Sequence, residues 1–208
     1  MKICMINGSP KAKDSCSRYL IDEIIKLMDD KTEVLICDGS HKPFKDDMFQ
    51  QIYNCDKVVF VFPLYVDAVP SHLVYFLESF QEYIRLQPVK NISVYAVSNC
   101  GFYEGEQNKY ALKIIENFCE DSGLNWQFGI GTGTGPFIAQ SQTIPWQSSV
   151  KRPIYQALIA LKKGLEEGYQ PKENIFVMAK MPRYIYIASA HAGWRLSAKK
   201  NNLRFRDI

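Results

Sequence analysis

The 208-residue chain lacks the features that mark several classes of protein. Its six cysteines form no C-x-x-C pair, and His41, His72 and His191 do not have the spacing of metal ligands. No apolar stretch approaches the length of a membrane span. The opening MKICMINGSP is interrupted by Gly8 and Pro10, where a secretory signal would continue as an apolar run. We therefore expect no metal, no membrane span, and a reduced, cytoplasmic protein.

The chain also has little excess charge. Its formal net charge is +3, without the concentrated basic stripe that nucleic-acid-binding proteins carry, so we expect no nucleic-acid partner. Apolar residues make up 47% and charged residues 23%, a balance typical of a globular protein. The length suits one α/β domain, with room for an appended segment.

Short apolar runs alternate with segments of helical period along the first 130 residues. The runs cover 2–6, 33–37, 57–62, 92–98 and 124–130, and helical patterns occupy the intervals between them. This alternation predicts a parallel sheet covered by helices on both faces. With the first and third strands central, the expected architecture is a three-layer, doubly wound, five-stranded sheet of order 2-1-3-4-5.

Three more predictions concern the residues from 124 onward. LNWQFGI (124–130) alternates, with Leu124, Trp126, Phe128 and Ile130 on one side, which is typical of an edge strand. GTGTGPFIAQSQTIPW (131–146) reads as a loop. Two helices should follow, one near 154–165 and one near 182–201.

Three polar or turn-rich segments follow central strands of the expected sheet, at 7–17, 63–67 and 99–103. Because the carboxyl ends of parallel strands lie at one edge, we expect these segments to meet there, where open α/β sheets bind ligands. Ser15, Cys16 and Ser17 would begin the first helix, whose unpaired amides favour a phosphate. The alternative is that the serines only cap the helix.

The other two segments carry aromatics and turn residues. Pro63, Tyr65 and Asp67 belong to one, and Gly101 and Tyr103 to the other. Each is also compatible with an ordinary turn, but together they favour a ligand with a phosphate and a flat ring. No G-K-[ST] and no G-x-G-x-x-G is present, and we interpret GTGTG as structural.

INGSPKAKDSCS, PLYVDAVPSHL and SNCGFYEG together resemble the phosphate loop and the two ring loops of the flavodoxin-like NAD(P)H-dependent FMN reductase family. The resemblance covers about residues 1–130 and implies non-covalent FMN. By position, the phosphate would be held by Ser9, Lys11, Ser15, Cys16 and Ser17. The ring would be bordered by Pro63, Leu64, Tyr65 and Val66, with Asn99, Gly101 and Tyr103 at its other edge.

The resemblance implies an oxidoreductase that passes hydride from NADPH or NADH through FMN to a small electron acceptor such as a quinone, a flavin or a nitro compound. Iron–sulfur relatives carry a cysteine cluster after the second strand, and DGSHKPFKDD has no cysteine there. Two alternatives stay open: a flavodoxin-like electron carrier, and a non-enzymatic binding module. Relatives are commonly homodimers, so a homodimer is expected.

The C-terminal segment stands apart from this scheme. We expect an FMN-binding domain at 1–170 and a helical extension at 171–208. Within it, MPRYIYIASAHAGWRLSAKKNNL (181–203) resembles a C-terminal helix of clostridial-type members. The extension is basic, and Tyr184, Ile187, Ala188, His191 and Trp194 share a helical stripe. Packing on the domain or on a dimer partner is favoured over a membrane surface or an acidic partner.

Overall fold

The computed structural model describes residues 1–11, 13–40 and 43–203, so that His41 lies outside the described residues. Within the described residues, six parallel strands form one sheet in the order β2-β1-β3-β4-β5-β6. The doubly wound sheet and its order 2-1-3-4-5 are thus confirmed, and one short strand is added at the edge. The strands are β1 (Lys2–Asn7), β2 (Glu33–Asp38), β3 (Lys57–Pro63), β4 (Ser93–Asn99), β5 (Asn125–Thr132) and β6 (Ile175–Val177).

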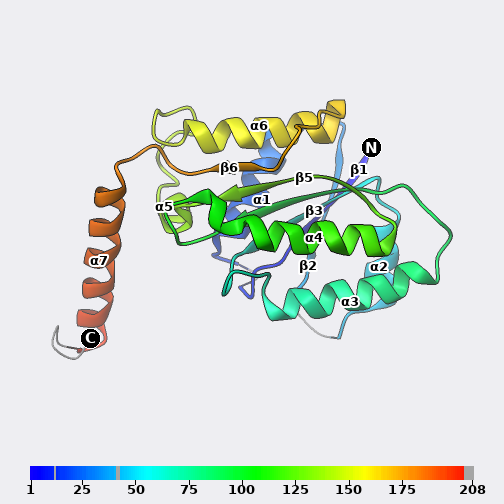
Figure 1. The fold of residues 1–208 in the computed structure, drawn as a ribbon, viewed down its shortest axis with the longest axis horizontal. Coiled ribbons are helices and arrows are strands. Elements are labelled where there is room, and N and C mark those ends of the chain that lie inside the picture. The colour runs from blue at the N-terminus through cyan, green and yellow to red at the C-terminus, as the bar shows by residue number, and fades with distance from the viewer. Residues whose placement is uncertain (12, 41–42, 204–208) are drawn as a thin grey trace.

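Helices cover both faces of the sheet, which gives three layers (Figure 1). One face packs against α1 (Cys16–Leu27), α5 (Gly135–Gln140) and α6 (Arg152–Glu167). The other packs against α2 (Asp46–Tyr53), α3 (Ser71–Arg85) and α4 (Lys109–Ser122), the last preceded by the short 3-10 helix η1 (Gly105–Asn108). Each core is continuous from the strands to its helices.

Helix α1 positions the first loop after β1. Leu20, Ile21 and Ile24 recur at helical spacing and are fully or almost fully buried against the sheet. Burying each such side chain contributes roughly 1.5–3 kcal/mol. This packing fixes the start of α1 at the carboxyl edge of the sheet.

The segment after β5 differs from the expected loop, because Gly135–Gln140 forms the short helix α5. Six residues are too few for a helical period to be visible in the sequence. Gly133, before α5, and Gly135, its first residue, pack too closely for any side chain. An added Cβ at Gly133 would stand 2.1 Å from the Tyr103 carbonyl oxygen, and one at Gly135 would stand 2.8 Å from that of Cys100.

Strand β5 also departs from its expected form. Val94 pairs with Trp126 and the next residue, Tyr95, pairs with Phe128, so Gln127 is the extra residue of a bulge. The side chains expected on one side are therefore divided: Leu124 and Trp126 pack with α3 and α4, whereas Phe128 and Ile130 pack with α1 and α6. The prediction that this is an edge strand is wrong for the carboxyl half of β5, because that half pairs with β6.

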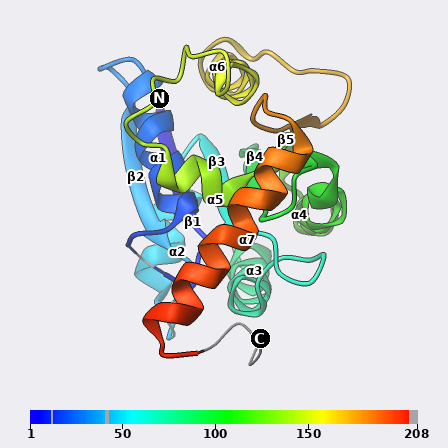
Figure 2. The ribbon, with the colours of Figure 1, turned by 90° about the vertical axis from the view of Figure 1, so that its left-hand side faces the viewer.

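The last helix, α7 (Arg183–Lys200), confirms the helix expected near 182–201. It stands apart from the three layers (Figure 1) and lies in front of the carboxyl ends of the strands (Figure 2). Tyr186 is its one buried side chain among the described residues. Across the described part of the chain, no helix has the length and apolar character that crossing a bilayer requires.

Candidate ligand site at the carboxyl edge

A cavity of about 380 Å³ opens at the carboxyl edge of the sheet, among the segments that follow β1, β3 and β4 and the start of α5. Its size lies within the range of small-molecule pockets. Ten of the twelve residues predicted from the sequence line it: Ser9, Lys11, Ser15, Cys16, Ser17, Pro63, Leu64, Tyr65, Asn99 and Gly101. Val66 and Tyr103 do not. The sequence analysis missed Asp14, Cys100, Gly135, Pro136 and Ala139, which complete the lining.

The start of α1 forms one end of the cavity. Ser15 is the N-cap residue in extended conformation, and its Oγ accepts a hydrogen bond from the Arg18 amide at 3.1 Å. The amides of Cys16 and Ser17, in the first turn, have no partner within the helix. These amides and the helix dipole favour an anion there. The cation of Lys11 also borders the cavity.

Ser17 connects α1 to the strands beside it. Its Oγ accepts a hydrogen bond at 2.9 Å from Nδ2 of Asn99, which also donates to the Phe62 carbonyl at 2.9 Å. Ser17 and Asn99 are both buried. The hydroxyl of Ser17 therefore holds the ends of β3, β4 and α1 together, and the group that Ser17 offers to a ligand is its backbone amide.

Hydrogen bonds hold the described start of the first loop, residues 7–11. The Ser9 amide donates to Oδ1 of Asn7 at 3.2 Å, and the Lys11 amide donates to Oγ of Ser9 at 3.2 Å. Nε2 of His72, at the start of α3, lies 3.0 Å from the carbonyl oxygen of Gly8. These contacts come from the loop itself and from helix α3, and they fix the start of the loop, residues 7–11.

Two thiols line the cavity, and both are held in the neutral form. Burial, with a smaller contribution from the neighbouring Cys100, raises the pKa of Cys16 to about 12. Burial also raises the pKa of Cys100. At neutral pH neither group is a thiolate nucleophile. Cys16 lies at a helix start, but burial raises its pKa and keeps the thiol protonated at neutral pH.

The segment after β3 makes a tight turn at the rim. The amide of Tyr65 donates to the Ala68 carbonyl, and the Ala68 amide donates back, both at 3.0 Å. Between them Val66 and Asp67 have φ of 49° and 59°. A β-branched residue in this left-handed region is strained by about 1–3 kcal/mol. The turn leaves Tyr65 half exposed at the cavity and directs Val66, 98% exposed, into solvent.

The segment after β4 joins the cavity to α7. A Cβ added to Gly101 would meet nothing within 4 Å, so the space beside this residue is open. The hydroxyl of Tyr186 donates to the Gly101 carbonyl at 2.7 Å. Tyr103 turns away from the cavity, because its hydroxyl donates to the Met181 carbonyl at 2.5 Å and its ring lies 5.9 Å from that of Tyr186.

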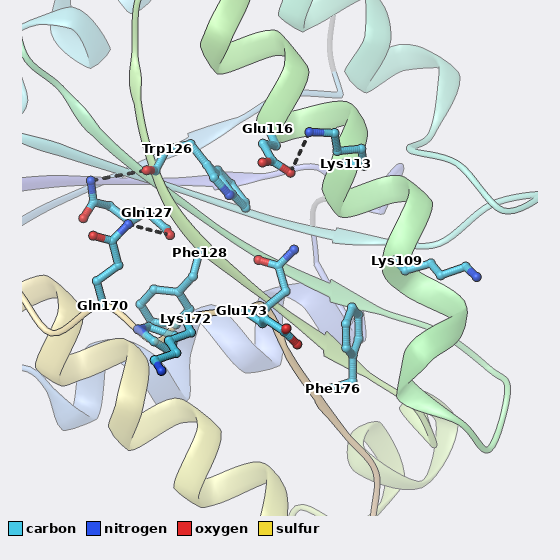
Figure 3. A pocket seen from close by; sticks show the side chains of 12 residues that line it. Lys109, Lys113, Glu116, Trp126, Gln127, Phe128, Gln170, Lys172, Glu173 and Phe176 are labelled. Carbon is cyan, nitrogen blue, oxygen red and sulfur yellow. Dashed lines mark hydrogen bonds and ion pairs between the residues drawn. The ribbon is translucent and has the colours of Figure 1, made fainter.

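A second hollow, of about 500 Å³, lies beside β5 and α4 (Figure 3). Several of its polar groups are engaged with one another or with the strand. Lys113 pairs with Glu116 at 3.2 Å, Nε2 of Gln170 donates to the Gln127 carbonyl, and Oδ1 of Asn174 accepts from the Gly129 amide at 2.7 Å. These side-chain amides protect the free part of the β5 edge. We therefore place the candidate site at the carboxyl edge.

The described residues contain no group of three or more His, Cys, Asp or Glu side chains that could hold a metal ion. The cavity itself supplies amide and hydroxyl donors, one lysine cation and an exposed aromatic ring. This set suits an organic anion with a planar part.

No family model and no curated protein matches the chain. Solved structures do share its fold. One is an NADPH-quinone reductase from P. pentosaceus, with 12% identity over 79% of this chain and 97% of that chain and a TM-score of 0.58. Another is the apo form of an NADH:FMN oxidoreductase, with 12% identity over 78% of this chain and 88% of that chain and a TM-score of 0.56. An azoreductase from Bacillus anthracis is also similar, with 14% identity over 81% of this chain and 100% of that chain and a TM-score of 0.51. At these identities the likeness concerns the fold alone.

Proposed function

We propose that this chain binds FMN non-covalently and is an oxidoreductase that passes hydride from NADPH or NADH, through the flavin, to a small electron acceptor. The observation that carries the proposal is the cavity between the segments after β1, β3 and β4, where the strand order reverses and ten of the twelve expected residues meet. A quinone, a flavin and a nitro compound are the acceptor classes that we propose.

The start of α1 is the proposed phosphate end. The amides of Cys16 and Ser17 point out of the first turn, with Lys11 and the hydroxyls of Ser9 and Ser15 nearby. Helix-end electrostatics contribute about 0.3–1 kcal/mol for each charge, and up to about 2 kcal/mol when partly buried. The neutral thiol of Cys16 places no competing negative charge there.

The two turns form the proposed ring end. Pro63, Leu64 and Tyr65 border it on one side, and Asn99 with the open space beside Gly101 borders it on the other. Bound FMN would supply the hydride chemistry, and the chain supplies the position and shape of the cavity. The outward direction of Val66 and the contact of Tyr103 with Met181 argue against contacts from these two side chains.

The structural neighbours support the proposal by what their names state: one is an NADPH-quinone reductase and another an NADH:FMN oxidoreductase. We further propose a homodimer and a cytoplasmic location. A carrier without nicotinamide turnover and a non-enzymatic module are the alternatives that the test below separates.

The test is an absorption spectrum of the purified chain titrated with FMN, repeated after anaerobic addition of NADPH or NADH. We expect saturable FMN binding and bleaching of the flavin band by at least one nicotinamide, followed by turnover with a quinone. Binding without bleaching by either donor would identify a carrier, and absence of FMN binding would refute the proposal.

A further inference from the structure

Lys151, between α5 and α6, is a buried cation that the proposed function does not use. Among the described residues, it is the one Lys, Arg, Asp or Glu that is buried, with no exposed surface. It is also the N-cap residue of α6, where the helix dipole disfavours a positive charge. Lysine is almost never fully buried unless its charge has partners. The contacts of Lys151 must therefore offset two unfavourable contributions.

Two carbonyl groups and two aromatic rings contact the ammonium group of Lys151. Its Nζ donates to the carbonyl oxygens of Ser141 at 2.6 Å and of Ile144 at 3.1 Å. Nζ also lies 4.5 Å from the ring centroid of Trp146 and 5.7 Å from that of Tyr19, within the range of cation–π contacts. We call these four groups the ammonium cage. Because carbonyl oxygens and ring faces accept and do not donate, the cage suits a cation.

Glu23 supports the cage from α1. Its Oε2 accepts a hydrogen bond from Nε1 of Trp146 at 2.6 Å, and the ring of Trp146 stacks on that of Tyr19 at 5.9 Å. The Glu23 carboxylate thus holds the Trp146 ring beside the ammonium group. Burial lowers the pKa of Lys151, and the negative charge of Glu23 opposes this shift.

The ammonium cage connects two helices that border the candidate site. Ser141 is the C-cap residue of α5, and Pro136 and Ala139 of α5 line the cavity. Tyr19 belongs to α1 and lies one turn after the residues that line the cavity at the start of that helix. The two helices lie side by side (Figure 2). A single ammonium group, that of Lys151, therefore contacts the end of α5 and the first turns of α1.

We propose that Lys151 is a positioning residue, whose charged side chain sets how α5 lies against α1 and thereby the shape of the cavity. Lys151 does not line the cavity, so it acts on a ligand only through these two helices. The role of the cage does not depend on FMN. Its expected effect on the affinity for FMN rests on the proposed function.

The first test compares Lys151→Met with a matched control, Lys57→Met. Methionine is unbranched and similar in length to lysine, so each substitution removes the charge and keeps most of the volume. Nζ of Lys57 also donates to a carbonyl, that of Gly164 at 3.1 Å, and lies 5.9 Å from the ring of Tyr95. Lys57 begins β3, however, at the end of the strand opposite to the cavity.

Two measurements follow the cavity in these variants. One is the rate at which N-ethylmaleimide alkylates Cys16, which lines the cavity, in the protein without FMN; Cys119, in the core, reports global opening. The other is the Kd for FMN. For Lys151→Met we expect alkylation of Cys16 and the Kd each to rise about tenfold, with Cys119 unchanged. For Lys57→Met we expect wild-type values.

The second test asks whether the cage requires a charge. Lys151→Ala removes three carbons and the ammonium group, which are the atoms of propylammonium. Propylammonium should therefore raise the melting temperature of this variant without FMN, relative to sodium at equal ionic strength. The neutral 1-propanol should not raise it, and neither compound should raise that of the wild type.

Wild-type alkylation of Cys16 in folded Lys151→Met overturns the positioning role, and so does equal acceleration at Cys16 and Cys119. Equal effects of propylammonium and 1-propanol on Lys151→Ala overturn the requirement for a cation. Alkylation and melting are measured without FMN. A wild type that binds no FMN would therefore count against the proposed function and leave these two results to decide the role of Lys151.

Discussion

Replacing Gly101 by leucine tests the candidate site without disturbing the fold. The φ of Gly101 lies outside the left-handed region, and a Cβ there would meet no atom of the chain within 4 Å. The new side chain has room in the unliganded protein. We therefore expect the free energy of unfolding without FMN to change by no more than about 0.5 kcal/mol.

Binding should respond very differently. Gly101 lines the cavity, so a leucine side chain would occupy part of the space that we assign to the flavin ring. Forcing extra methylenes into a packed site costs about 1–3 kcal/mol. At 1.4 kcal/mol for each tenfold change, the Kd for FMN should rise roughly 5- to 150-fold.

Quenching of FMN fluorescence during titration measures this Kd, and denaturant unfolding of the apo protein measures stability. Phe102→Ala is the matched control, because Phe102 is the next residue, is half exposed and does not line the cavity. We expect the control to keep the wild-type Kd. Equal Kd values for Gly101→Leu and the wild type would refute the assignment of this space to the ring.

Three further substitutions test other parts of the argument. Ser17→Ala removes the acceptor of the buried bond from Asn99 and should lower the unfolding free energy by about 1–3 kcal/mol in urea titration; an unchanged midpoint would contradict the role of the Ser17 hydroxyl. The raised pKa of Cys16, about 12 against an ordinary 9.0, stabilises the folded state below pH 9 and loses that effect as the pH rises from 9 to 12. Stability should therefore fall over this range, and less so in Cys16→Ala; identical pH profiles would show that the thiol is not buried in this way. Gly133→Ala places a Cβ 2.1 Å from the carbonyl oxygen of Tyr103 and should lower the melting temperature markedly, whereas a wild-type melting temperature would show that the loop can move aside.

The position of the cavity could be predicted from the sequence, because it depends on strand order and chain direction. Once 2–6, 57–62 and 92–98 are parallel neighbours, the segments after them must share an edge, and the cavity joins them there. The start of the first helix was equally readable, since Ser15 is a preferred N-cap residue directly before an apolar period.

What sequence reasoning missed depends on single residues or on distant contacts. The bulge at Gln127 adds one residue to strand β5, so the side chains after it point to the opposite faces of the sheet from those that simple alternation predicts. The alternation of residue types in the sequence does not show such a bulge. Strand β6 has three residues and α5 six, both below the length at which a period appears. Tyr103 turns away from the cavity because it bonds Met181, 78 positions later.

The amides at the start of α1 belong to the backbone, so exchanging side chains one at a time leaves them in place. Conventional alanine scanning from Ser15 to Ser17 would therefore understate what this turn contributes. Proline at position 16 would delete one N–H while suiting the first position of a helix, and the extended backbone of Ser15 (φ −116°, ψ 154°) already has the conformation that precedes proline. A contribution from a backbone amide is measured only by a substitution that removes its N–H group.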